Sequence, residues 1–204
     1  MYVYISVLNM GWVHVGLANV LLNLAARGHP DYQIGIEFSG LGVERRPIAS
    51  NRNRIVRDCP PAADVLCMID SDIVPPLNFL DAASDEYDIL GLPMPIYRNG
   101  DIVVGIVPLD GQEFQPVGQM QVVECKAVAG GVFFIQRRVF AHPEMQAGFA
   151  DWFDEDGIVT HTEEHVYCEK ARRLGFRVWA NLGYPLGHVK EVDLKRLGLR
   201  AGNG

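Results

Sequence analysis

The chain has 204 residues, of which 49% are hydrophobic and 21% are charged, as is ordinary for a globular domain. The formal net charge of −7, from 18 Lys and Arg against 25 Asp and Glu, argues against a protein that binds mainly to a nucleic-acid backbone. No apolar stretch reaches the roughly 18 residues of a membrane span, and residues 1–8 lack the basic segment that opens a signal peptide. We therefore expect a soluble, cytoplasmic protein.

The first 92 residues alternate between strand-like and helix-like patterns. The expected strands are 2–8, 32–38, 64–69 and 88–92, and the expected helices are 14–27, 47–57 and 76–83. This alternation predicts a parallel sheet with helices on both faces. None of the four cysteines forms a C-x-x-C pair, so we expect buried free thiols.

The second half of the chain is less regular. Residues 93–120 are rich in proline and glycine, with short strand-like runs such as 102–107. Two apolar runs follow at 121–128 and 131–136, then a helix at 162–174 and a strand at 176–180. The length predicts a single domain over 1–204.

Asp70-Ser71-Asp72 stands directly after the apolar run 65–69 and before two prolines. Two carboxylates at i and i+2 of a strand end lie at the carboxyl edge of a sheet, where open α/β sheets bind ligands. Mg²⁺ or Mn²⁺ is held by one or two carboxylates together with substrate phosphates. The motif is therefore a candidate metal–diphosphate site, although Asp and Ser are also common in turns and helix caps.

Glu163 and Glu164 open the expected helix at 162–174. They suit the helix dipole there, and a carboxylate fixed beside a cleft is also a good general base. His188 follows the last strand, and its imidazole is a suitable further ligand for Mn²⁺.

Arginines and glycines supply two more candidate features. Arg45, Arg46, Arg52 and Arg54 suit phosphate recognition, or else form a solvated basic surface. Gly130-Gly131 either lets a ligand approach the backbone closely or marks a β-bulge.

Taken in order, these features resemble the GT-A glycosyltransferases, in particular the compact family 2-like members. The order runs from a first strand, through Asn51-Arg52-Asn53 and Asp70-Ser71-Asp72, to Gly130-Gly131, the acidic pair and Gly187-His188. The resemblance covers residues 2–190. It implies an α/β GT-A fold, with a mainly parallel central sheet flanked by helices and a small second sheet. It also implies a nucleotide-binding half (1–92), an acceptor and catalytic half (93–190) and a tail (191–204).

The resemblance further implies roles for individual residues. Asp70, Asp72 and His188 would bind Mn²⁺ or Mg²⁺, and Arg52, Asp70, Ser71, Gly130 and Gly131 would contact the donor. Glu164, with Glu163 as the alternate, would be the catalytic base. The expected activity is metal-dependent transfer of a sugar, with inversion, from a UDP-, GDP- or CDP-linked donor to an acceptor hydroxyl. The acceptor class stays open between a glycan, another hydroxyl compound and, without support from the acidic charge, modified DNA.

Other classes of protein fit less well. In haloacid-dehalogenase-type phosphatases the D-x-D lies on the first strand, and in zincins the glutamate directly follows the first histidine, where this chain has Thr162. A nucleotidyltransferase on a related sheet and a non-catalytic nucleotide-sugar-binding module are the alternatives that stay open.

Overall fold

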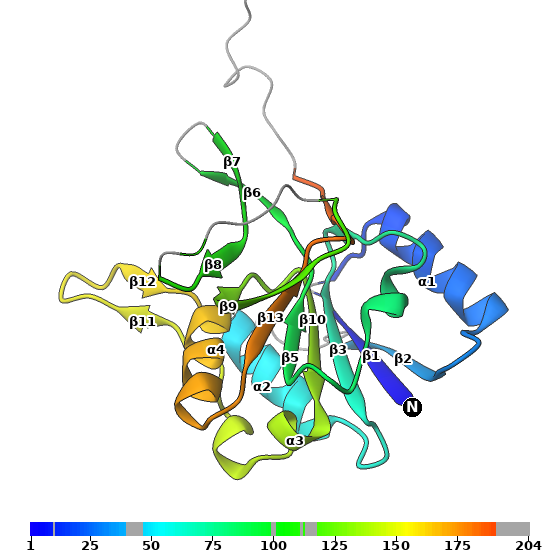
Figure 1. The fold of residues 1–204 in the computed structure, drawn as a ribbon, viewed down its shortest axis with the longest axis horizontal. Coiled ribbons are helices and arrows are strands. Elements are labelled where there is room, and N and C mark those ends of the chain that lie inside the picture. The colour runs from blue at the N-terminus through cyan, green and yellow to red at the C-terminus, as the bar shows by residue number, and fades with distance from the viewer. Residues whose placement is uncertain (10, 40–46, 99–100, 111, 113–117, 191–204) are drawn as a thin grey trace, which may run out of the picture.

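The computed structural model describes residues 1–9, 11–39, 47–98, 101–110, 112 and 118–190. Its centre is an eight-stranded sheet with the order β2-β1-β3-β10-β5-β13-β9-β8 (Figure 1). The strands are Tyr2–Leu8 (β1), Gln33–Ser39 (β2), Val65–Asp70 (β3), Ile89–Gly91 (β5), Ile106–Pro108 (β8), Val122–Val128 (β9), Val132–Gln136 (β10) and Val178–Asn181 (β13).

The sheet is mainly parallel, as predicted. β1 is parallel to β2 and β3, and β13 is parallel to β5. β10 is antiparallel to both β3 and β5, and β9 is antiparallel to both β13 and β8. Six strands therefore point one way, and β9 and β10 are the two reversed strands.

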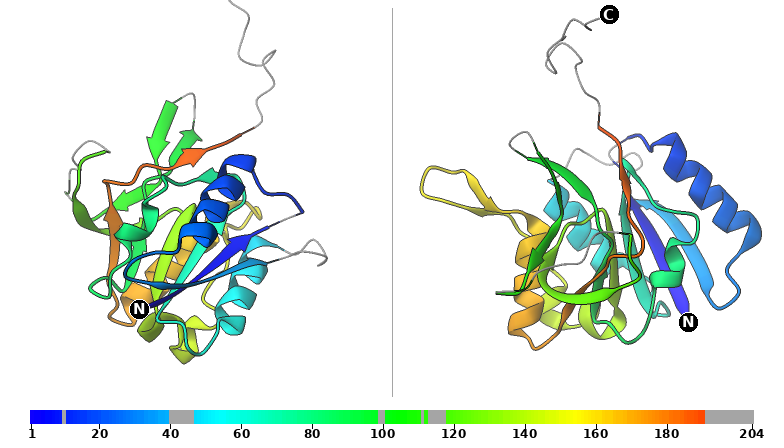
Figure 2. Two further views of the ribbon diagram at one scale, coloured as in Figure 1. Left: turned by 90° about the vertical axis from the view of Figure 1, so that its right-hand side faces the viewer. Right: turned by 45° about the horizontal axis from the view of Figure 1, so that its top comes forward.

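Helices cover both faces of the sheet, which confirms the α/β architecture (Figures 1 and 2). Helix α1 (Val15–Arg27) packs on one face, and α2 (Ile48–Asp58) and α4 (Glu163–Arg173) pack on the other. The shorter helical segments are η1 (Phe79–Ala82), α3 (Arg137–Phe140) and η2 (Pro143–Met145).

The residues of the central strands alternate between the two faces. In β3, Val65, Cys67 and Ile69 face the α1 side, whereas Leu66 and Met68 face the α2 side. All five are buried because the strand lies inside the sheet and is covered on both faces. All four cysteines are buried free thiols, as predicted, and burial raises the pKa of Cys59 to about 12.

In the described part of the chain, three two-stranded ribbons accompany the central sheet, where the sequence predicted a small second sheet. They pair β4 (Ile73–Val74) with β14 (Gly187–His188), β6 (Pro95–Arg98) with β7 (Asp101–Val104), and β11 (Trp152–Phe153) with β12 (Val159–His161). The β11–β12 hairpin projects from the body of the molecule beside the start of α4 (Figure 1 and the right panel of Figure 2).

Two predicted elements differ in detail from the structure. The helix expected over 76–83 is the single turn η1, because Phe79 and Asp81 bond backbone carbonyls only three residues back. The strand-like run 102–107 is divided at Gly105, where the chain passes from the β6–β7 ribbon to the main sheet. A side chain at Gly105 would meet Ala129 and Ile96. The tail at 191–204 and two of the candidate arginines, Arg45 and Arg46, lie outside the described residues.

Two neighbouring leucines of α1 test the packing of this helix on the sheet. Leu21 is 3% exposed and Leu22 is 69% exposed, so the two residues share a helix but not an environment. We expect Leu21→Ala to lower the free energy of unfolding by about 2–5 kcal/mol. Leu22→Ala should change it by less than about 0.5 kcal/mol. Urea unfolding curves of both variants measure the difference, and similar losses in both would contradict the packing described.

Candidate functional site

The carboxyl end of β3 carries the first group of candidate residues. The strand ends at Asp70, Ser71 follows in a turn, and Asp72 precedes β4. The carbonyl of Ser71 accepts a hydrogen bond from the backbone N–H of His14 (2.8 Å), which holds the turn against the start of α1. Both aspartates bond to basic side chains from other elements, so their role extends beyond forming the turn.

A cavity of about 300 Å³ lies over this turn. The aspartates of the motif share it with a histidine and a lysine from the end of the described chain. The lining includes Trp12, Asp70, Ser71, Asp72, His188 and Lys190. The structure therefore brings together residues separated by more than a hundred positions in the sequence, at the sheet edge where the motif was expected to lie.

Arg52 joins the end of β3 to the start of α4. The side chain comes from the middle of α2, and the residue is 1% exposed. Its Nη2 donates to Asp70 Oδ1 (2.9 Å) and its Nε donates to Glu163 Oε1 (3.2 Å). A buried guanidinium without such partners would be very costly. The interpretation of the arginine segment as a solvated basic surface therefore does not hold for Arg52. Arg54 of the same helix is half-buried, and Arg57, farther along it, is exposed.

The reversed direction of β10 places Gly130 and Gly131 in this site. Because β10 is antiparallel to β3, its first residues lie beside the last residues of β3, and the N–H of Asp70 donates to the Gly131 carbonyl (3.2 Å). The N–H of Gly130 donates to Glu164 Oε1 (3.3 Å). A Cβ at position 130 would overlap with the Arg52 guanidinium. The glycine pair forms a turn into β10 that admits this guanidinium, and is not a β-bulge.

The two glutamates that open α4 differ in their protonation. Burial, and then the neighbouring Glu164 carboxylate, raise the pKa of Glu163 to about 7. Burial also opposes the ionisation of Glu164, but the Arg52 guanidinium and a backbone N–H outweigh it and lower the pKa of Glu164. Glu164 is therefore ionised at neutral pH. Its Oε2 is buried and has no hydrogen-bond partner in the described part of the chain.

His188 reaches the other aspartate through the pairing of β14 with β4. Its Nε2 lies 3.4 Å from Asp72 Oδ2, and its Nδ1 lies 2.7 Å from the carbonyl oxygen of Pro95. A carbonyl only accepts, so in the neutral ring the proton sits on Nδ1 and the Nε2 lone pair faces Asp72. The Lys190 ammonium also contacts Asp72 Oδ2 (2.6 Å). Asp72 and His188 thus present lone pairs to a position that suits a cation.

The metal site expected from the sequence is only partly assembled. Among the described residues, no three His, Cys, Asp or Glu side chains gather closely enough to form a complete metal site. Asp72 and His188 lie together, whereas Asp70 lines the same cavity with one oxygen bound to Arg52. Burial raises the pKa of Asp70 to about 6, with Arg52 opposing the shift. Two protein ligands fit Mg²⁺ or Mn²⁺ if substrate phosphates and water complete the shell.

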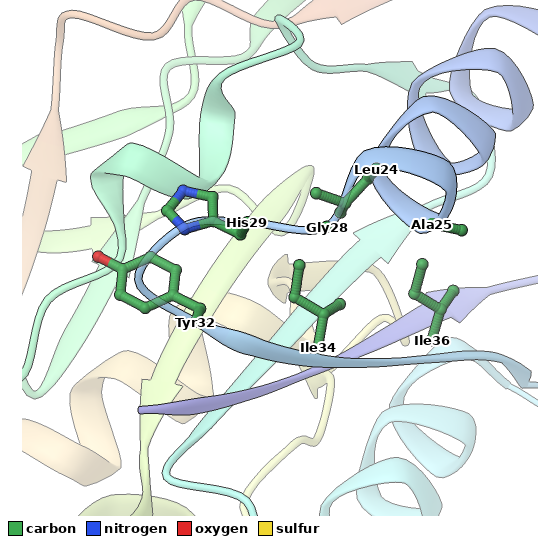
Figure 3. A pocket seen from close by; sticks show the side chains of 7 residues that line it. All are labelled: Leu24, Ala25, Gly28, His29, Tyr32, Ile34 and Ile36. Carbon is green, nitrogen blue, oxygen red and sulfur yellow. The ribbon is translucent and has the colours of Figure 1, made fainter.

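A second cavity of about 380 Å³ lies at the far end of α1 (Figure 3). Leu24 faces Ile34 and Ile36 of β2 across it, and His29 stacks on Tyr32 with ring centroids 4.3 Å apart. The 13 residues of α1 separate it by about 20 Å from the turn at Ser71, which contacts the start of the helix. None of its lining residues is acidic, so it does not offer a second metal–diphosphate site.

Lys190 is the member of the site that the sequence analysis did not single out. A signal was available, because His188 and Lys190 are two positions apart in an extended segment and therefore point to the same side. The pairing of β14 with β4 determines that this side faces Asp72, and the sequence alone does not reveal that pairing.

Comparison of the structure with solved structures shows that the fold is that of the GT-A glycosyltransferases. A197 from STIV aligns over 94% of this chain and 87% of its own, with a TM-score of 0.59 and 16% identity. Drosophila β1,4-galactosyltransferase 7, a D211N mutant in complex with manganese, UDP-Gal and xylobiose, aligns over 99% of this chain and 76% of its own (TM-score 0.54, 15% identity). GalNAc-T7 with UDP, GalNAc and Mn²⁺ aligns over 95% of this chain but 44% of its own (TM-score 0.58, 12% identity).

Comparisons of the sequence find less. No protein-family model matches the sequence, and no curated protein matches it. In the described ranges, every helix is too short or too polar to span a lipid bilayer.

Gly130 and Gly131 form a matched pair for testing the packing around Arg52. A methyl group at 130 would displace a guanidinium held by the carboxyl groups of Asp70 and Glu163, whereas one at 131 would chiefly meet the flexible Met94 side chain. We expect Gly130→Ala to lower the free energy of unfolding by about 1–3 kcal/mol, and Gly131→Ala to cost less. Chemical denaturation measures both, and equal costs would contradict the constraint placed on Arg52.

The raised pKa of Glu163 predicts how stability depends on pH. The native state holds a proton on Glu163 that the unfolded chain releases between about pH 4.5 and 7, so ionisation of this group lowers stability as pH rises through that window. Glu163→Gln removes the titration. The stability of this variant relative to wild type should therefore increase from pH 4.5 to 7, by at most about 1.4 kcal/mol per pH unit. Urea unfolding at several pH values measures the difference, and a constant or decreasing one would contradict the assignment.

Proposed function

We propose that this protein is a nucleotide-sugar-dependent glycosyltransferase that transfers a sugar to an acceptor hydroxyl. The observation that carries the proposal is the position of Glu164, ionised and with one unbonded oxygen, at the same edge of a GT-A sheet as Asp70 and Asp72. Two similar structures are complexes with manganese and UDP-Gal, and with Mn²⁺, UDP and GalNAc, which supports a donor of this class.

Asp72 and His188 are the residues that would hold Mn²⁺ or Mg²⁺, with Asp70 available from the same cavity. A bound metal ion would neutralise the charge that develops on the leaving diphosphate. Lys190 now neutralises Asp72, and on donor binding it would turn its ammonium group toward the phosphates. Ser71 and Gly131, which adjoin the aspartates, would lie beside the donor.

Glu164 is the proposed base, and Arg52 and Gly130 position it. The carboxylate accepts the proton of the acceptor hydroxyl while the acceptor oxygen forms a bond to the anomeric carbon. The bond from that carbon to the diphosphate oxygen breaks, and its electron pair leaves with the diphosphate. Attack opposite the leaving group inverts the configuration. The Gly130 N–H holds Oε1 of Glu164, and the buried Oε2 is the oxygen that would have to turn toward the acceptor to take the proton.

Glu163 has a different part in this proposal. It is bonded to Arg52, it is 7% exposed, and its raised pKa favours the protonated form at neutral pH. A protonated carboxyl is a poor base, so Glu163 would fix the guanidinium and leave proton transfer to Glu164. A non-catalytic binding module would have no use for this asymmetry between adjacent carboxyls.

Nucleotide binding tests the donor half of the proposal. We expect Mn²⁺-dependent binding of at least one of UDP, GDP or CDP, measured by isothermal titration calorimetry. Asp72→Asn should weaken it at least tenfold because a ligand charge is lost. Asp31→Asn, at an exposed aspartate two residues before β2, is the matched control and should leave binding unchanged. If none of the three nucleotides binds, or if Asp72→Asn binds as wild type does, the donor site is wrong.

Substitution of Glu164 tests the catalytic half. We expect Glu164→Gln to lower kcat for transfer or for slow donor hydrolysis by about 10²–10⁴-fold, with nucleotide affinity kept, because the amide does not take the acceptor proton. Release of nucleoside diphosphate from UDP-, GDP- and CDP-sugars measures the rate. A variant with unchanged kcat would remove Glu164 as the base.

A further inference from the structure

The β11–β12 hairpin carries apolar side chains that the fold does not use. All eleven residues from 152 to 162 are exposed, so none of them contributes to the hydrophobic core. Phe153 is 59% exposed, Ile158 is 63% exposed and Trp152 is 36% exposed. Apolar side chains gathered on a projecting element in this way are typical of a binding surface.

Three rings of this region form a row that ends in the first turn of α4, the helix that carries the proposed base. Trp152 pairs with His161 across the hairpin, and their ring centroids are 5.4 Å apart. His161 in turn meets His165 of α4, with centroids 6.4 Å apart. His165 directly follows Glu164, and its Nδ1 contacts the hydroxyl of the helix cap Thr162 (3.2 Å). The row Trp152–His161–His165 thus leads from the hairpin to the first turn of α4.

The charge of this region restricts what can bind there. From 139 to 169 the chain has no Lys or Arg. Its eight acidic residues are Glu144, Asp151, Asp154, Glu155, Asp156, Glu163, Glu164 and Glu169. Burial lowers the pKa of His165, so this ring adds no positive charge near neutral pH. The acidic segment would repel a nucleic acid or a phosphorylated acceptor, and it offers the phosphates no Lys or Arg of its own.

We propose that the Trp152–His161–His165 row is the acceptor-binding surface and that the acceptor is an uncharged carbohydrate. A pyranose presents a face of C–H groups that fits an exposed aromatic ring, whose π face is electron-rich, and it carries hydroxyls at its edge. A sugar stacked on the row would bring a hydroxyl toward the start of α4, where Glu164 lies. This inference rests on the proposed function, because only a transferase has an acceptor. Binding of a carbohydrate to the row can nevertheless be measured without any transfer reaction.

The neighbouring aromatic residue of the same hairpin provides a matched control. Phe153 pairs with Val159 across an irregular register, and it makes no ring contact with the Trp152–His161–His165 row among the described residues. Phe153 is more exposed than Trp152, so exposure alone would make it the stronger contact. Only the position of Trp152 in the row of ring contacts makes it the expected sugar-binding residue.

The test uses the full chain and a panel of neutral disaccharides (xylobiose, lactose, cellobiose and maltose), observed by saturation-transfer NMR with Mg²⁺, alone and with UDP, GDP or CDP. We expect at least one disaccharide to bind. Trp152→Ala should weaken it about tenfold and Phe153→Ala less than twofold. Nucleotide affinity should be equal in all three proteins. A single-stranded DNA oligonucleotide and a heparin disaccharide should not bind.

The outcomes separate this inference from the proposed function. If nucleotide binds but no neutral disaccharide does, or if Trp152→Ala binds the disaccharide as wild type does, the acceptor surface is wrong and the donor site stands. If a disaccharide binds in a way that depends on Trp152 but no nucleotide binds, the carbohydrate-binding surface is supported and the proposed glycosyltransferase activity is contradicted. Tighter binding of the oligonucleotide would overturn the acceptor class. A dimer that Trp152→Ala dissociates, seen by light scattering, would assign the row to self-association and overturn the inference.

Discussion

The buried guanidinium of Arg52 holds the candidate site together. It is shielded from water and bonded to carboxylates from β3 and from the start of α4, so it joins two elements that are far apart in the chain. One positive charge faces the carboxyls of Asp70, Glu163 and Glu164, which is too little to keep all three ionised at low cost. Protonation therefore falls on Glu163, and Glu164 stays ionised. The proposed difference between a positioning carboxyl and a basic one follows from this charge balance.

The reversed strand β10 and the short ribbon β4–β14 bring the remaining parts to that edge. A parallel strand in the place of β10 would put its first residues at the other end of β3. Because β10 is antiparallel, Gly130 arrives beside Asp70 and leaves room for Arg52. The β4–β14 pairing does the same for His188 and Lys190 at Asp72. In both cases backbone pairing, and not side-chain attraction, determines which groups meet.

The two sides of the site differ in charge in a way that fits two substrates. On the side proposed to bind the donor, Lys190 and His188 lie beside Asp72, where phosphates would bind with a metal ion. On the side of α4, the segment 139–169 is acidic and carries exposed rings. A charged donor and an uncharged acceptor would each find a suitable surface, and the anionic side would discourage a second nucleotide from occupying the acceptor position.

The sequence by itself determined the main strands and helices, because their apolar periodicity records which faces are buried, and it placed Asp70 and Asp72 at a strand end. It also ordered the features that resemble GT-A enzymes. Only the tertiary structure decided that Arg52 is buried while Arg57 is exposed, that Lys190 contacts Asp72, and that Asp70 bonds to Arg52. The tertiary structure also decided that Glu163 holds a proton. These facts depend on strand pairing and on desolvation between residues as much as 118 positions apart, and a local pattern carries no information about either.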